Sequence, residues 1–131
     1  MVRERVDDGA SVLLSSHVLA AERLVAVHAL AVPYHLCCVA LGIAVSTLVS
    51  RAGVAQRVAL GGLFALFMFE SLAASSEYDR AGAISPTAHY DPSAVLVNAE
   101  YDAAGAAILL AATAALVALA ALRFRRADLA G

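Results

Sequence analysis

The sequence of 131 residues has no tryptophan and no lysine, so all nine basic residues are arginines. Charge is scarce, because 15% of the residues are charged against about 25% in an average soluble domain. The hydrophobic share is 62%, above the roughly 45–50% of soluble domains. These figures exclude a disordered chain and predict a small integral membrane protein. The net charge of −2 gives no basic surface for nucleic acid, which is not an expected partner.

Cysteine is represented only by the adjacent pair Cys37 and Cys38, inside an apolar run. Neighbouring cysteines rarely reach disulfide geometry, and no second thiolate pair is present to complete a metal site. We expect the two to serve as small apolar residues of a helix. No secretory signal is expected, because the first apolar stretch, residues 12–14, is far too short.

Three windows are long and apolar enough to cross a bilayer, whose core of about 30 Å needs about 20 mostly apolar residues in a helix. The clearest, residues 103–122, carries no charge and is followed by three arginines. Residues 24–49 are interrupted by Pro33, and residues 55–74 form the weakest window. The sequence therefore predicts an all-α membrane protein with about three transmembrane helices.

The segments between these windows differ in charge. Residues 75–102 hold five carboxylates and one arginine, whereas arginines occupy the short turn after residue 49 and the segment after residue 122. By the positive-inside rule, the turn and the C-terminus are cytoplasmic and the acidic loop is extracytoplasmic, in a multi-pass protein of the cell membrane. Three spans then put the N-terminus outside, which conflicts with Arg3, Arg5 and Arg23.

The acidic loop contains a helix signal of its own. Residues 92–97 are apolar enough for a short helix that dips back toward the membrane, with Pro92 as its first residue and Asp91 as its N-cap. The alternative is a surface loop without a helix.

Small residues recur at four-residue spacing in all three windows, which lets helix backbones approach closely in lipid. We expect these stripes to form helix-packing faces, and a partner to complete the assembly. The stripes are Cys38, Gly42, Ser46 and Ser50; Gly61 and Ala65; and Ala107, Ala111 and Ala115.

Few polar residues in or near the windows could carry chemistry. His28 and His35 could ligate haem or relay protons, but they lie about 10 Å apart along one helix, so one iron cannot take both. We expect polar helix–helix contacts from them, and neither cofactor nor metal. Glu70 could line a translocation route, or be an interfacial carboxylate that reaches water. Tyr90 and Asp91 are the loop candidates.

No nucleophile–base pair, phosphate-binding loop or carboxylate pair can be assembled from the spacing of residues. The sequence therefore predicts no enzyme and no catalytic residue.

From residue 55 onward the chain resembles the C-terminal half of an ABC-2 type transporter permease, including archaeal and bacterial members tied to copper and nitrous-oxide reductase maturation. The resemblance depends on consecutive pieces in the family's order. These are AQRVALG at residues 55–61, FESL at 69–72, ISPTAHYDPSAVLV at 84–97 and LRFRRADL at 122–129, the last similar to an ending FRRRDL common in these permeases. Residues 24–51 fit the preceding span less distinctively, so the permease-like region is residues 24–131.

Residues 1–23 resemble a different protein, the switch region (H-loop) of an ABC ATPase. The stretch DGASVLLSSHVL at residues 8–19 is similar to a strand in which His17 would contact the γ-phosphate of ATP. A short helix over residues 18–24 would follow the strand. The ATPase's phosphate-binding loop, signature motif and Walker B pair are missing from this sequence, so we expect this fragment not to bind nucleotide.

The resemblance implies a permease subunit of an ABC-2 type transporter, or a truncated remnant of one produced by fusion with an ATPase tail. Such a chain would form part of an export route together with further permease subunits and a separate ATPase. The alternative is a small accessory transmembrane subunit of a respiratory or regulatory complex, without a transport role.

Overall fold

The computed structural model describes the backbone of residues 2–128 and the side chains of residues 15–126 other than Asp79. Three long helices dominate the fold, α1 (Val2–Ser46), α2 (Ala52–Ala73) and α3 (Ala103–Asp128). Between α2 and α3 lie three short helical segments, η1 (Asp79–Ile84), η2 (Pro86–His89) and η3 (Ala94–Asn98). Residues 2–128 contain no strand.

Each long helix contains a segment long and apolar enough to cross a membrane. These segments are Ser15–Ser46, Ala52–Ala74 and Ala103–Arg126. The predicted all-α, multi-pass architecture is thereby confirmed, and the three predicted windows fall on the three helices. Among the described residues, the first apolar segment includes residues 24–46 of the predicted window 24–49, and α1 is the longest of the three helices.

The strand expected upstream of residue 18 is wrong, because α1 is helical without interruption from Val2 to Ser46. Ala and Leu, both strong helix formers, are frequent in α1 as a whole, although only three of residues 2–17 are Ala or Leu. A single strand here would also leave its backbone N–H and C=O groups without a neighbouring strand. A helix satisfies these groups within the segment.

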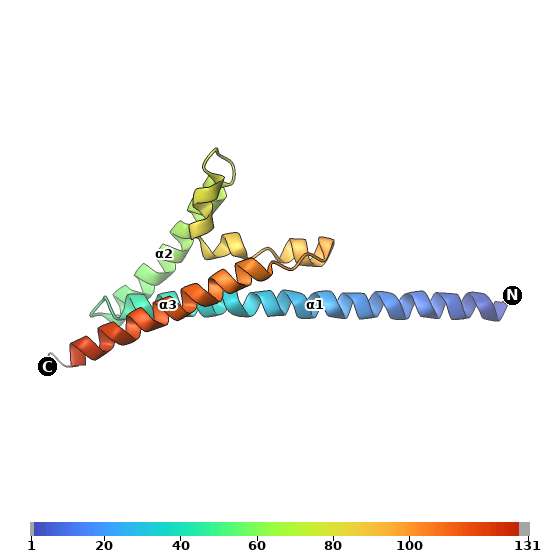
Figure 1. Ribbon diagram of the computed structural model, residues 1–131, viewed down its shortest axis with the longest axis horizontal. Helices are drawn as coiled ribbons and strands as arrows, with labels where there is room; N and C mark the ends of the chain where they lie inside the picture. Colours follow the sequence, from blue (N-terminus) through green and yellow to red (C-terminus); the bar gives the residue numbers. More distant parts are fainter. Residues whose placement is uncertain (1, 129–131) are drawn as a thin grey trace.

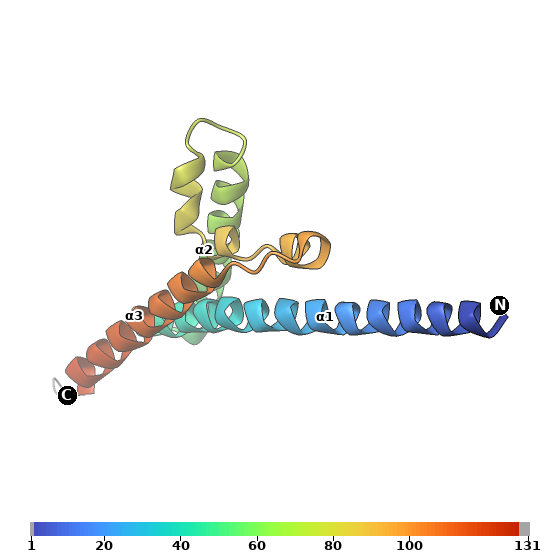
Figure 2. The same cartoon turned by 45° about the vertical axis from the view of Figure 1, so that its right-hand side comes forward.

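The helices α1 and α3 lie side by side, whereas α2 leaves them at a steep angle (Figure 1). Seen from a second direction, η1 returns along α2, and η2 and η3 lead the chain back to α1 (Figure 2). We call the side of the fold with η1, η2 and η3 the loop end. The opposite side, with residues 47–51 and 123–128, is the turn end.

With 45 residues at about 1.5 Å each, α1 is about 67 Å long, more than twice the thickness of a bilayer core. Its N-terminal half extends past the loop end, beyond the reach of α3 (Figure 1). The N-terminus and the loop therefore lie on the same side, as three membrane crossings require.

The contact between α1 and α3 is a seam of mostly small side chains. On both helices the seam residues are separated alternately by three and four positions, the spacing of left-handed helix pairs. On α1 they are Leu30, Pro33, Cys37, Ala40 and Ala44, all buried; on α3 they are Ala106, Leu109 and Ala120, buried, with Thr113 and Leu116 half-buried.

The predicted small-residue stripes are wrong as packing faces within this chain. Gly42 is half-buried and has no neighbouring atom within 4 Å of where a Cβ would stand, and Ala107, Ala111 and Ala115 are exposed. Gly61 and Ala65 of α2 are exposed as well. A strict four-residue spacing turns about 40° around the helix at each step, so it drifts away from a straight seam.

The seam predicts that volume added there will destabilise the protein. Ala40 is 1% exposed in the seam, whereas Ala29, on the same helix, is exposed. Replacing Ala40→Leu should lower the free energy of unfolding by about 1–3 kcal/mol, because a packed interface cannot accommodate three more carbons without strain.

The measurement is reversible unfolding in detergent, monitored by circular dichroism. Ala29→Leu is the matched control and should leave stability within about 0.5 kcal/mol. Equal effects of the two substitutions would contradict the seam.

Candidate functional site

The loop between α2 and α3 is anchored to α1 through η3. Val95 of η3 is 2% exposed and forms one buried cluster with Leu30 of α1 and Ala106 of α3. Ala26, Val27 and Tyr90 pack around this cluster. The acidic loop thus contains a short helical segment, as predicted, although η3 spans Ala94–Asn98 rather than residues 92–97. The loop belongs to the same core as the two packed helices.

Asp91 is the predicted cap of this segment. Its Oδ1 accepts hydrogen bonds from the backbone N–H groups of Ser93 at 2.9 Å and Ala94 at 3.0 Å. At the other end, Ala99 adopts a left-handed conformation with φ 58°, which terminates the helix. The side chain of Asp91 is thus used in a local cap, and its outer surface stays exposed.

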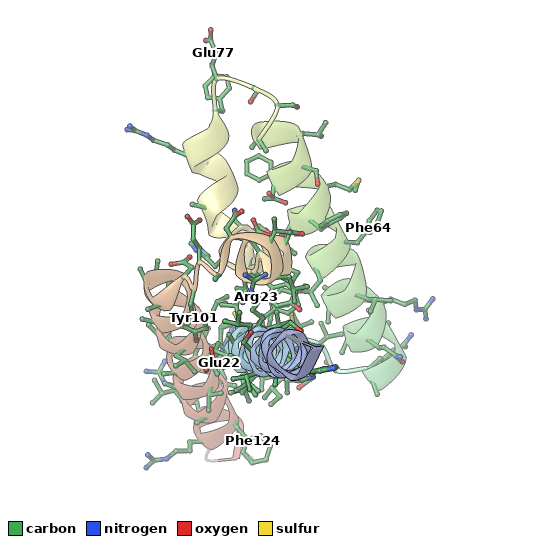
Figure 3. All side chains as sticks on the ribbon, turned by 90° about the vertical axis from the view of Figure 1, so that its right-hand side faces the viewer. Glu22, Arg23, Phe64, Glu77, Tyr101 and Phe124 are labelled. Atoms are coloured by element: carbon green, nitrogen blue, oxygen red, sulfur yellow. The ribbon has the colours of Figure 1, made fainter. Side chains whose placement is uncertain are left out.

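A hydrogen bond joins Arg23 of α1 to the last turn of η3. The Nη1 of Arg23 donates a hydrogen bond of 2.8 Å to the backbone carbonyl of Leu96, and its Nε is buried without a partner. Figure 3 shows Arg23 between α1 and the loop. A guanidinium at this end of a helical segment meets carbonyl groups that point outward and carry partial negative charge. A hollow of about 420 Å³ beside it is lined by Ser16, Leu19, Ala20, Arg23 and Leu96.

A row of aromatic rings forms a second link between the loop and α1. Tyr90 stacks on Tyr34, with ring centroids 4.7 Å apart and planes inclined by 14°. His35 meets Tyr34 edge-on, with ring centroids 5.5 Å apart. Two sequence candidates from distant parts of the chain, His35 and Tyr90, are thereby brought to one place through Tyr34.

His28 and His35 are exposed on α1, and each has its Nδ1 2.7 Å from a backbone carbonyl of its own helix, that of Leu24 and that of Ala31. Each ring therefore donates its Nδ1 hydrogen within α1 and presents Nε2 outward. Within the described part of the chain, no group of three or more His, Cys, Asp or Glu residues could hold a metal ion.

Glu70 is half-buried near the end of α2, next to η1. Gly82 of η1 comes close enough that a Cβ built on it would lie 3.6 Å from Cγ of Glu70 and 3.4 Å from Cβ of Ala73. These are ordinary van der Waals distances, so η1 packs directly on α2, and its approach does not depend on glycine at position 82. Glu70 belongs to this α2–η1 contact, and not to the contacts that join the loop to α1.

His17, the residue similar to the ATPase switch histidine, lies on an exposed face of α1. The helix continues through the expected boundary at residues 23 and 24 without a break. Arg3 and Arg5 lie outside the residues whose side chains are described. Arg23, by contrast, lies at the loop end, in contact with the loop itself, and this contact accounts for an arginine on that side.

Two residues that join the loop to α1 were missed by sequence reasoning. Arg23 was noticed only as a charge that contradicted the predicted topology, and that contradiction was the available signal. Tyr34 gave no signal, because one tyrosine in an apolar helix has no periodic partner; only the fold brings it to Tyr90.

The fold and these contacts define a multi-pass α-helical membrane protein with a structured loop docked on its first helix. Comparison with known proteins adds no relative: no family model, curated protein or solved structure matches the chain.

The Arg23 contact predicts a measurable local stability. Arg23→Gln should speed amide hydrogen exchange of residues 94–98 about tenfold, because a hydrogen bond from a charged donor contributes about 1.5 kcal/mol or more. The measurement is hydrogen–deuterium exchange with mass spectrometry on the purified protein.

Arg57→Gln is the matched control, since the Nε of Arg57 bonds to the carbonyl of Gly53 within its own helix. This control should leave exchange in η3 unchanged. If Arg23→Gln also leaves it unchanged, Arg23 does not hold the loop.

Proposed function

We propose that the chain is a permease subunit of an ABC-2 type transporter, and that it forms part of a transmembrane export route together with further permease subunits and a separate ATPase. The resemblance of residues 55–129, piece by piece and in order, supports the identity of the class. The uncovered polar and helical surfaces described below support its role as a subunit.

The observation that carries the subunit role is the exposure of His35. This residue lies well inside the apolar segment Ser15–Ser46, yet its ring is exposed. Polar and ionisable side chains within a membrane almost always face other helices or a water-filled cavity rather than lipid. Another membrane subunit that covers this face of α1 would bury His35 and meet its outward Nε2.

The position of α2 agrees with this interpretation. Two of the 23 residues of its apolar segment are buried in the chain, against five of 32 in Ser15–Ser46 and four of 24 in Ala103–Arg126. Its buried residues, Ala55 and Ala73, lie close to its two ends, and Leu60 and Phe64 between them are 70% and 63% exposed. The middle of α2 is therefore available to lipid or to another helix.

The candidate residues from the sequence have two different roles in this proposal, according to where they lie. His28 and His35 would contact a partner helix, whereas Glu70, Tyr90 and Asp91 would shape the loop end of the route. None is assigned a catalytic role, and no cofactor is invoked. The chemistry of ATP hydrolysis would belong to the separate ATPase.

Photo-crosslinking tests the proposal. A photoreactive residue in place of Val39, which is 59% exposed one turn beyond His35, should form an adduct with a polytopic permease subunit or with a second copy of this chain. An ABC ATPase should co-purify with that adduct, and His35→Leu should lower its yield severalfold. The matched control is the same photoreactive residue at Ala44, which is 6% exposed in the seam and should react within the chain.

Two outcomes would contradict the proposal. Co-purification of an oxidoreductase subunit, or stoichiometric haem absorbance in the purified chain, would favour the accessory subunit of a respiratory or regulatory complex. Adducts to lipid alone at position 39, with no membrane protein recovered, would show that His35 faces no partner.

The proposed orientation has its own test. We propose that the turn end is cytoplasmic in the cell membrane, because Arg51, Arg57 and the three arginines after residue 122 lie there. A single cysteine at Glu77 should react with an impermeant maleimide in intact cells, whereas one at Ala127 should react only after lysis. The labelling is done with Cys37 and Cys38 replaced by alanine, and the reverse pattern would invert the topology.

A further inference from the structure

Two adjoining hollows at the turn end have different chemical linings. The first, about 420 Å³, is an apolar groove between α1 and α3 with Arg125 as its one charged residue; its lining is Ile43, Ser46, Thr47, Val117, Ala120, Ala121, Phe124 and Arg125. The second, about 270 Å³, is more polar and is lined by residues 46–50, Arg123 and Phe124. Ser46, Thr47 and Phe124 are common to both, so the two hollows meet.

We propose that these hollows bind one anionic phospholipid. An acyl chain would lie in the apolar groove, and the phosphate would be held at its mouth by Arg123 and Arg125. The groove opens on the membrane-facing surface, because Ile43 and Val117 on its two sides are 46% and 45% exposed. It runs to the ends of the apolar segments Ser15–Ser46 and Ala103–Arg126, which is the depth at which a lipid headgroup lies.

The charge at the turn end selects an anion. The segments that meet there carry Arg51, Arg123, Arg125 and Arg126, with Asp128 as their one carboxylate, and Arg57 follows near the start of α2. Basic pockets between transmembrane helices are a recurrent binding site for anionic headgroups, and a guanidinium can hold a phosphate through two parallel hydrogen bonds. A zwitterionic lipid would gain less, because its ammonium group would add a cation to an already cationic site.

The hydroxyl groups of Ser46 and Thr47, which line both hollows, are not available as donors to a phosphate. Ser46 Oγ donates to the carbonyl of Ile43, and Thr47 Oγ1 donates to that of Ala44, both at 2.7 Å. Their hydrogens are therefore used within α1. The guanidinium groups of Arg123 and Arg125 are the remaining charged donors at the mouth of the groove.

Native mass spectrometry of the full chain, purified in detergent and delipidated, tests the site. The probes are phosphatidylglycerol and phosphatidylcholine with identical acyl chains. The wild-type protein should retain one phosphatidylglycerol with an affinity at least about tenfold above that for phosphatidylcholine. Arg123→Gln and Arg125→Gln should each weaken phosphatidylglycerol binding about tenfold, as expected for the loss of a charged hydrogen bond.

Arg57→Gln removes the same charge from the same end of the protein but outside both hollows, so it should not change the affinity. A second pair of variants tests the groove without changing charge. Ala121→Trp would fill the groove and should abolish retention of the lipid, whereas Ala118→Trp, exposed on α3 outside the groove, should not. Circular dichroism verifies that each variant is folded.

Three results would overturn the proposal. Equal retention of the two lipids would remove the role of charge. Equal weakening by Arg125→Gln and Arg57→Gln would show diffuse attraction by the whole basic end rather than a site. Retention that survives both Ala121→Trp and Arg125→Gln in folded protein would place the lipid elsewhere.

Discussion

The packing of α1 against α3 is the contact on which the other contacts of the fold depend. In lipid there is no hydrophobic force to bring two apolar helices together, so their association depends on how closely the backbones approach. Ala40, Ala44 and Ala106 allow that approach. Leu30 extends the same seam to the loop end, where it also meets Val95 of η3. The seam therefore creates the surface on which the loop docks. Without it, Val95 of η3 would contact only one of the two helices that now bury it.

Much of the secondary structure could be predicted from the sequence, because its causes are local. The absence of charge over residues 103–122 identifies α3, and Asp91 followed by Pro92 indicates a helical segment just ahead of η3. These signals act within a few residues, so no knowledge of the fold is needed to interpret them. The one local prediction that failed, the strand before residue 18, depends on a resemblance, whereas the structure continues the helix through these residues.

The tertiary contacts could not be predicted in the same way. The four-residue stripes of small residues, such as Ala107, Ala111 and Ala115, occur readily in an alanine-rich chain, and the seam residues buried on α3 are others: Ala106, Leu109 and Ala120. The site was predicted only in its parts: His35 and Tyr90 were candidates, but Tyr34 and Arg23, which tie the loop to α1, depend on which face of α1 meets the loop. That face is fixed by Leu30 and Val95, which are 65 positions apart (95 − 30).

The length of α1 has a mechanical consequence. About half of its roughly 67 Å exceeds the thickness of a bilayer core, so the helix is a stiff rod with one end in the seam and the other far outside the membrane. A sideways force on the outer half would be resisted at Arg23 and at the cluster around Leu30, and would act there with the leverage of a long arm. The docked loop would then oppose tilting of α1. A partner that binds the outer half of α1 could change the angle between α1 and α3 without entering the membrane.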